Sequence, residues 1–178
     1  SDEFGATFDL STDALAQKVA VNVLSEEVSI IGSEAFMNPS ESDEVTLGYY
    51  ASTEIGQFTV DFGARFDFID REGSLSHEEE HHDDEDHGDE DHGDEHHDEE
   101  HEMEYYSRSD NNTSLSMSLS NEITDSLSFT LGISNVERTP SSIELFMNGA
   151  HMATGRYEVG DVNLKSETSR NILSLIHI

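Results

Sequence analysis

The residues best suited to chemistry lie in one uninterrupted segment from His77 to Glu102, here called the His/acid tract. All 26 of its residues are His, Asp, Glu or Gly: eight histidines, sixteen carboxylates and two glycines. Neutral imidazole and carboxylate suit zinc, and the same nitrogen and oxygen donors can bind copper or nickel. A solvated acidic loop that served only solubility would explain the carboxylates but not the histidines. The tract therefore predicts capture of a divalent metal.

The spacing of the histidines favours many interchangeable sites over one rigid centre. His77 and His81 are four residues apart, a spacing that lets two imidazoles share a metal on one helical turn. Four histidines within 82–97 recur every five residues, which no regular element places on one face, and two glycines weaken any helix. Overlapping sites would recapture a metal released by a neighbour. The candidate metal ligands in the tract are His77, His81, His82, His87, His92, His96, His97, His101, Asp86, Asp91 and Glu95.

Composition excludes several other classes of function. The formal net charge of -32 makes nucleic acid and anionic membrane surfaces poor partners. The chain has no Cys, so thiolate metal sites are not available. It contains no nucleophile elbow. We therefore predict no catalytic residue and no resident cofactor.

Outside the tract, the dominant pattern is alternation of apolar with polar or small residues. It is clearest from Gln57 to Arg71, where Phe58, Phe62 and Phe66 share one face. Periodicity typical of helices is almost absent. The chain is therefore predicted to be all-β, an antiparallel up-and-down meander. The expected strands cover residues 5–10, 17–31 (with a bulge near 25–27), 45–51, 57–71, 114–120 and 127–133.

Such a meander fits a soluble sandwich or a transmembrane barrel, and three features favour the barrel. The strands are long for a soluble protein and long enough to cross a bilayer. The apolar face from Phe58 to Phe68 carries no charge, as a lipid-facing surface requires. Short turns at 52–56 and 121–125 alternate with long loops at 32–43, 72–106 and 137–158. Asp61, Arg65 and Asp67 would then face the interior, where we expect structural pairing.

The segment from Arg138 onward carries a dense motif. It includes Arg138-Thr139-Pro140, Glu144-Leu145-Phe146, Asn148-Gly149 and Tyr157-Glu158-Val159-Gly160. This motif resembles a signature of TonB-dependent outer-membrane receptors, in which it covers an extracellular loop and the strand that returns from it. Gly32 to Phe36 with Pro39 resembles a second loop motif of the same family. A His/Asp/Glu-rich extracellular loop on such a barrel resembles the zinc-uptake subgroup.

The resemblance implies a 22-stranded transmembrane β-barrel with an N-terminal plug, in contact with outer-membrane lipid of a Gram-negative bacterium. The receptor would import a scarce nutrient with energy relayed by TonB through the plug and TonB box. On this interpretation residues 1–172 form part of the barrel, and 76–104 form an extracellular loop without order until metal binds. The chain has about seven expected strands, too few to close a barrel. Residues 173–178 resemble the translation of a sequencing-library transposon end and are a candidate non-native tail.

These observations predict an outer-membrane receptor that imports zinc and captures the metal with its His/acid tract. One alternative is a receptor for another metal or a metal chelate, such as nickel, copper, a siderophore or haem. The other is a soluble periplasmic metal-binding protein, which would contain helices. His151 is a further candidate metal ligand, weighed against a local packing role. Arg138 and Glu144 are expected to organise their loop rather than touch the substrate.

Overall fold

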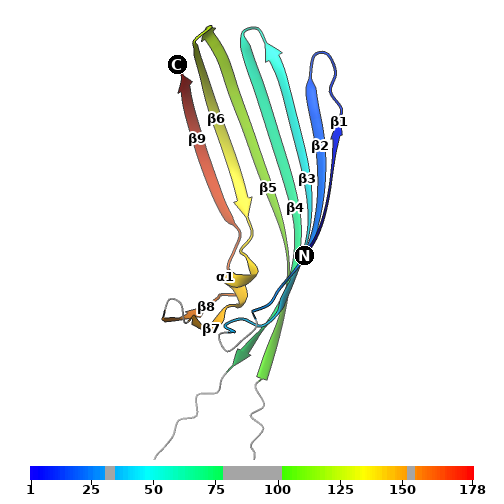
Figure 1. The fold of residues 1–178 in the computed structure, drawn as a ribbon, viewed down its shortest axis with the longest axis vertical. Helices are drawn as coiled ribbons and strands as arrows, with labels where there is room; N and C mark the ends of the chain where they lie inside the picture. The colour runs from blue at the N-terminus through cyan, green and yellow to red at the C-terminus, as the bar shows by residue number, and fades with distance from the viewer. Residues whose placement is uncertain (31–34, 78–101, 152–154) are drawn as a thin grey trace, which may run out of the picture.

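The backbone forms one curved antiparallel sheet with a small loop domain at one end (Figure 1). The structure, a computed structural model, describes residues 1–30, 35–77, 102–151 and 155–178. The sheet order β1-β2-β3-β4-β5-β6-β9 confirms the predicted all-β meander. In the described part, no helix has the length and apolar character needed to cross a membrane. The elements are β1 (Asp2–Asp9), β2 (Ala16–Val28), β3 (Ser40–Ile55), β4 (Phe58–His77), β5 (Glu102–Thr124), β6 (Leu127–Arg138), α1 (Ser142–Phe146), β7 (Asn148–His151), β8 (Arg156–Val159) and β9 (Glu167–His177).

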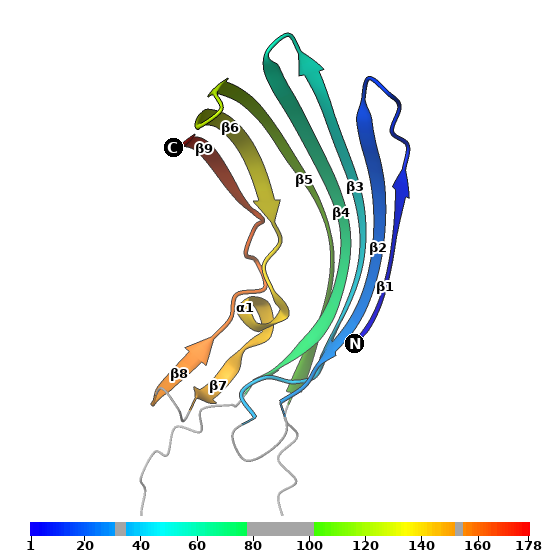
Figure 2. The ribbon, with the colours of Figure 1, turned by 45° about the horizontal axis from the view of Figure 1, so that its top comes forward.

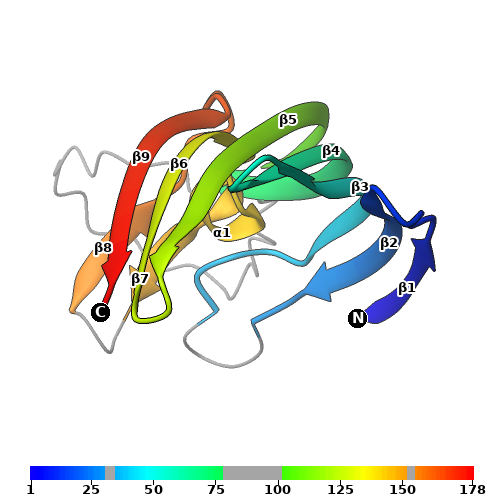
Figure 3. The ribbon, with the colours of Figure 1, turned by 90° about the horizontal axis from the view of Figure 1, so that it is seen from above.

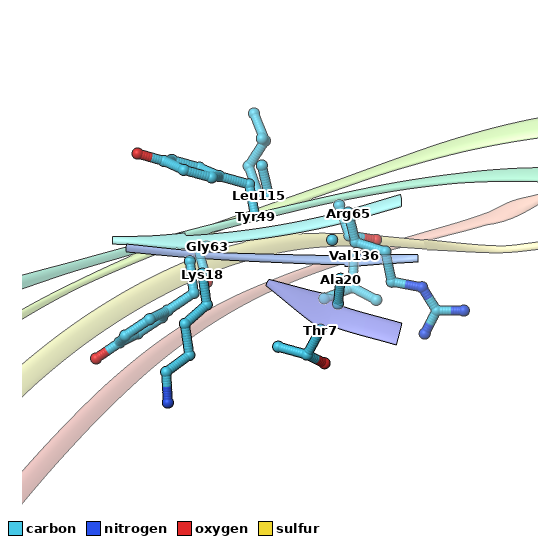
Figure 4. A pocket seen from close by; sticks show the side chains of 13 residues that line it. Thr7, Lys18, Ala20, Tyr49, Gly63, Arg65, Leu115 and Val136 are labelled. Carbon is cyan, nitrogen blue, oxygen red and sulfur yellow. The ribbon is translucent and has the colours of Figure 1, made fainter. Parts of the chain in front are cut away.

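The two faces of the sheet differ in chemistry because side chains alternate along each strand. The register aligns Val19 with Tyr49, Tyr49 with Ala64, and Ala64 with Leu115, so these four residues share one face. Figure 4 shows Tyr49 and Leu115 on one side of the sheet and Lys18 and Thr7 on the other. The face with Tyr49 is apolar and open, and we call it the convex face. The opposite, concave face carries α1 (Figure 2).

Short turns and long loops lie at opposite ends of the sheet, as predicted (Figure 1). The β3–β4 turn needs a positive φ, which Gly56 supplies at 66°. The β5–β6 turn lies at Asp125 and Ser126. At the other end, β2 leads to β3, β4 to β5 and β6 to β9 through longer segments. Seen from above, the strands trace an open arc rather than a closed ring (Figure 3).

The predicted bulge near 25–27 is wrong. β2 pairs with β3 without a shift in register from Ala16–Ser52 to Val28–Ser40. The apolar pattern changes parity because Val28 lies on the concave face, where it packs against buried loop residues. The irregularity in pairing lies instead between β5 and β6, at Glu122 and Thr124.

A small apolar core joins the loops to the concave face. Leu145 and Phe146 of α1 are 0% and 1% exposed, and Met37 is 5% exposed. Val28, Leu75 and Tyr106 of the sheet pack against them, with Ile30, Phe36 and Val162 from the loops. Helix α1 was not predicted, because its five residues are too few to show a helical period.

The final strand continues past the predicted native boundary. β9 pairs with β6 up to His177, opposite Ser128. This register places Leu173 and Leu175 on the concave face, where β6 presents Gly132 and Thr130 opposite them. That a tail begins at 173 stays a prediction.

Candidate functional site

The two ends of the His/acid tract are held side by side by a two-stranded ribbon. Pairing of β3 with β4 ends at Glu41–Glu72, but β4 and β5 continue together to His77–Glu102. The tract therefore begins at the outermost point of the longest strand pair in the sheet. The other predicted tract ligands lie outside the described residues: His81, His82, Asp86, His87, Asp91, His92, Glu95, His96, His97 and His101.

Side-chain amides cover the edge of β4 where β3 has ended. The Asn38 amide donates to the backbone carbonyl and the hydroxyl of Ser74, at 3.2 Å each. The Asn148 amide donates to the backbone carbonyl of Ser76 at 2.9 Å. Both carbonyls would otherwise lie on an open sheet edge. These contacts tie two loops to the base of the tract.

The β7–β8 hairpin lies at the end of the sheet where β4 ends and β5 begins (Figure 1), and β7 ends at His151. The hairpin starts at Asn148, which the Tyr157 hydroxyl contacts at 3.1 Å, and the backbone of His151 pairs with Arg156. The location agrees with the expected rim, while metal binding by His151 stays a prediction. Within the described ranges, no three His, Asp or Glu residues are grouped so that they could hold a metal ion.

Arg138 and Glu144 organise the loop, as expected. Two guanidinium nitrogens of Arg138 each donate to a Glu144 carboxylate oxygen at 2.9 Å, and Arg138 also contacts Glu167 at 3.1 Å. Glu144 in turn accepts from the Ser141 backbone N–H at 2.7 Å, which forms a capping box at α1. These donors lower the pKa of Glu144 to about 2. Glu144 is therefore ionised at neutral pH, and its contact with Arg138 keeps α1 attached to the end of β6.

Two further arginines connect the loop to the sheet, and no local sequence pattern indicated them. Arg71 and Arg108 lie directly opposite each other on β4 and β5. Arg71 donates to the Pro140 carbonyl, and Arg108 donates to the Leu164 carbonyl at 2.8 Å. Asp110 holds Arg108 through two bonds of 2.6 and 2.7 Å. The partners are 69 and 56 residues away in sequence, so only the fold reveals the contacts.

The interior charged residues have structural partners, as predicted. Arg65 contacts Asp67 at 2.6 Å and Glu44 at 3.1 Å. Asp61 accepts hydrogen bonds from the hydroxyls of Tyr50 at 2.8 Å and Ser118 at 2.9 Å. These concave-face groups are already satisfied and are not free ligands.

The arrangement concentrates negative charge at the loop end. Arg108 and Arg138 are ion-paired with Asp110 and Glu144, so their charge is locally compensated, while Arg71 donates to the Pro140 carbonyl. The tract adds sixteen carboxylates at the tip of the β4–β5 ribbon. A surface of this charge raises the local concentration of cations. Metal capture at the loop end stays a prediction, and its described residues form no catalytic arrangement.

Comparison with known families accounts for most of the chain. A model described as "TonB dependent receptor-like, beta-barrel" matches residues 3–172. The match spans the sheet and its loops and ends within β9. No curated protein matches the sequence.

Proposed function

Given that this chain belongs to the TonB-dependent receptor β-barrel family, we propose that its receptor imports zinc and that the His/acid tract captures the metal. The family places the chain in the outer membrane of a Gram-negative bacterium and makes it a receptor rather than an enzyme. A receptor of this family works with TonB on a ligand. Zinc is here the transported substrate.

The observation that carries the proposal is the position of an imidazole-rich tract on the long-loop side. In outer-membrane barrels the long loops are extracellular and the short turns periplasmic. The pairing of His77 with Glu102 fixes both ends of the tract at the tip of this side. Metal arriving from outside would meet the tract before it met the barrel interior.

The chemistry of the tract supports zinc as the substrate. Eight imidazoles supply nitrogen donors, and the carboxylates supply oxygen donors and a long-range attraction for divalent cations. Copper and nickel share this donor preference, so they are the competing substrates. The alternative of a soluble periplasmic protein is contradicted by the outer-membrane family.

The test is uptake of radioactive zinc by cells that depend on the full-length receptor for growth in limiting zinc. One variant replaces the eight tract histidines with Asn, which keeps every carboxylate. A second variant deletes 78–101. Both are expected to raise the half-saturating zinc concentration about tenfold or more, because recapture by neighbouring sites raises avidity by factors of ~10²–10⁴. The maximal rate should change little.

Metal competition and pH complete the design. Nickel and copper are each added in excess over radioactive zinc. If one of them suppresses zinc uptake and is itself taken up in larger amount than zinc, that metal is the substrate. Uptake should weaken as the medium is acidified through about pH 6.5, because protonated imidazole cannot bind metal. Unchanged zinc uptake in both tract variants would contradict the proposed role.

A further inference from the structure

The convex face carries one groove that ends at an arginine. The groove, about 430 Å³ in volume, crosses β4, β5, β6 and β9. Its apolar lining comes from Phe62, Leu115, Met117, Ile133 and Ile172. Asn135 and Arg170, opposite each other on β6 and β9, also line it. Because β9 starts at Glu167 on the loop side, Arg170 lies at the extracellular end of the groove.

Arg170 is distinctive in its position. Among the described residues of the seven-stranded sheet, it is the one basic residue that alternation places on the convex face. Lys18, Arg65, Arg71, Arg108 and Arg138 all lie on the concave face. Arg170 is exposed, and within the described chain it has no ion-pair partner. Arg170 therefore lies on the lipid-facing side without a counter-ion among the described residues.

The register shows how deep Arg170 lies. On β6 and β9 the apolar side chains of this face end at Ile133 and Ile172, and the next pair toward the loops is Asn135 and Arg170. Arg170 thus lies where apolar surface gives way to polar surface, the level of lipid headgroups. Long basic side chains at this level extend toward the headgroups while their stems cover apolar surface.

The remainder of the convex face directs anionic headgroups to this place. On β3 and β4, Asp43 lies opposite Asp70, and Glu41 lies opposite Glu72, beyond the apolar residues Val45 and Phe68. These four carboxylates repel phosphate. A phosphate near β6 and β9 meets the Arg170 guanidinium, which can bind it through two parallel hydrogen bonds. One carboxylate, Glu137, lies on the same face of β6, and it already accepts a hydrogen bond from the Thr113 backbone N–H at 2.8 Å.

We propose that this groove is a binding site for one phosphate-bearing lipid of the outer leaflet, with an acyl chain along Phe62, Met117 and Ile133 and the phosphate at Arg170. The site is independent of metal uptake. It would fix one lipid at a defined position on the wall of the receptor, whereas the β3–β4 side contacts lipids without selecting their headgroups.

Native mass spectrometry of the full-length receptor tests the site. The receptor is released from nanodiscs that contain equal amounts of phosphatidic acid and phosphatidylcholine, and the bound lipids are counted. Wild type should retain phosphatidic acid in preference. Arg170→Gln should lower that preference about fivefold, the effect of one basic residue near an anionic surface. Arg170→Lys should keep part of it, and higher salt should weaken it.

Matched variants separate the groove from the rest of the surface. Arg156→Gln removes a charge from β8 in the loop region and should change nothing. Met117→Ala shortens a groove side chain that is 48% exposed and should reduce retention of phosphatidic acid. Leu47→Ala makes a comparable change at a 40% exposed position outside the groove and should not.

Three results would overturn the proposal. One is equal retention of the two lipids by wild type, which would mean unselective contact with lipid. Another is an unchanged preference in Arg170→Gln when that variant still inserts into nanodiscs as a folded barrel. The third is displacement of phosphatidic acid by an equal concentration of inorganic phosphate, which would mean an anion site without a contribution from the groove.

Discussion

Asn148, at the start of β7, donates its side-chain amide to the backbone carbonyl of Ser76, 2.9 Å away and one residue before the His/acid tract. The two residues are 72 positions apart in sequence. Through this bond, the loop that follows β6 supports the ribbon that carries the tract. The edge of β4 is free there because β3 has ended at Ser40.

Substitution of Asn148 should loosen the base of the tract. Asn148→Ala removes the donor to Ser76 and is expected to cost about 0.5–1.5 kcal/mol of local stability. Amide hydrogen exchange of 73–77 should accelerate by several-fold in the full-length receptor. Asn163→Ala changes an exposed loop asparagine and serves as the control. Equal exchange rates in both variants would show that the amide contributes nothing to the ribbon.

The Arg138–Glu144 contact should make the loop sensitive to acid. The pKa of Glu144 is lowered from 4.5 to about 2 by Arg138 and Ser141. A carboxylate with a depressed folded-state pKa contributes stability that is fully present above 4.5 and is lost as the pH falls toward 2. Because the pair is exposed, solvent screening should keep its contribution to stability small.

Pepsin digestion of the purified receptor between pH 2 and 5 measures this effect. Cleavage within 139–166 should rise as the pH falls through this window, and Glu144→Gln should already be susceptible at pH 5. Glu72→Gln removes a carboxylate on the convex face and controls for general charge effects. If Glu144→Gln and wild type show the same pH profile, the contact is not a stabilising one.

The close approach of α1 to β4 depends on Gly73. A Cβ atom at this position would lie 2.6 Å from the Phe146 ring, which is itself 1% exposed. Gly73→Ala should therefore destabilise the loop core by about 1–3 kcal/mol. Phe146→Leu removes the ring, and the two changes together should cost less than their sum.

Chemical unfolding of the receptor in lipid vesicles, followed by protease sensitivity of the loops, provides the comparison. Gly132→Ala is the control, because its added Cβ would meet its nearest neighbours at 3.8 Å, an ordinary contact. A Gly73→Ala receptor as stable as Gly132→Ala would mean that α1 does not press on β4 in solution.

Neighbouring residues on β6 test which face meets lipid. Leu131 lies on the convex face at 47% exposure, and Thr130 lies on the concave face. Leu131→Lys should cost about 2–4 kcal/mol if it lies near the bilayer midplane. Thr130→Lys should cost far less because it loses only its hydroxyl contact with Ser120. The folded fraction recovered in outer membranes distinguishes the variants. A similar loss of folded receptor in both would contradict the assignment of the convex face as the lipid-facing one.

The alternation of side chains made the sheet predictable. Because the pattern has a period of two, Phe58 to Phe68 already defined a face, and the strand order followed from short turns. The interior placement of Asp61, Arg65 and Asp67 came from the same parity. The same rule explains why a bulge was wrongly predicted near 25–27. Val28 changes face because it leaves the lipid-facing band and joins the loop core.

The loop contacts could not be predicted from the sequence, because they join residues far apart in it. Arg71, Arg108, Asn38 and Asn148 are ordinary polar residues until the fold brings a carbonyl to each. Arg138 and Glu144 were found through a family motif rather than through periodicity. The tract ligands beyond His77 fall outside the described residues, so their metal binding stays a prediction.

The pairing of His77 with Glu102 also limits how far the segment between them can travel. Residues 78–101 number 24, and both ends are attached at adjacent points, so the farthest residue is at most 12 peptide units from its nearer anchor. At 3.3–3.6 Å per residue, the backbone of this segment can extend at most roughly 40 Å from the nearer anchor. A metal ion captured by this segment would therefore bind within that distance of the tip of the β4–β5 ribbon.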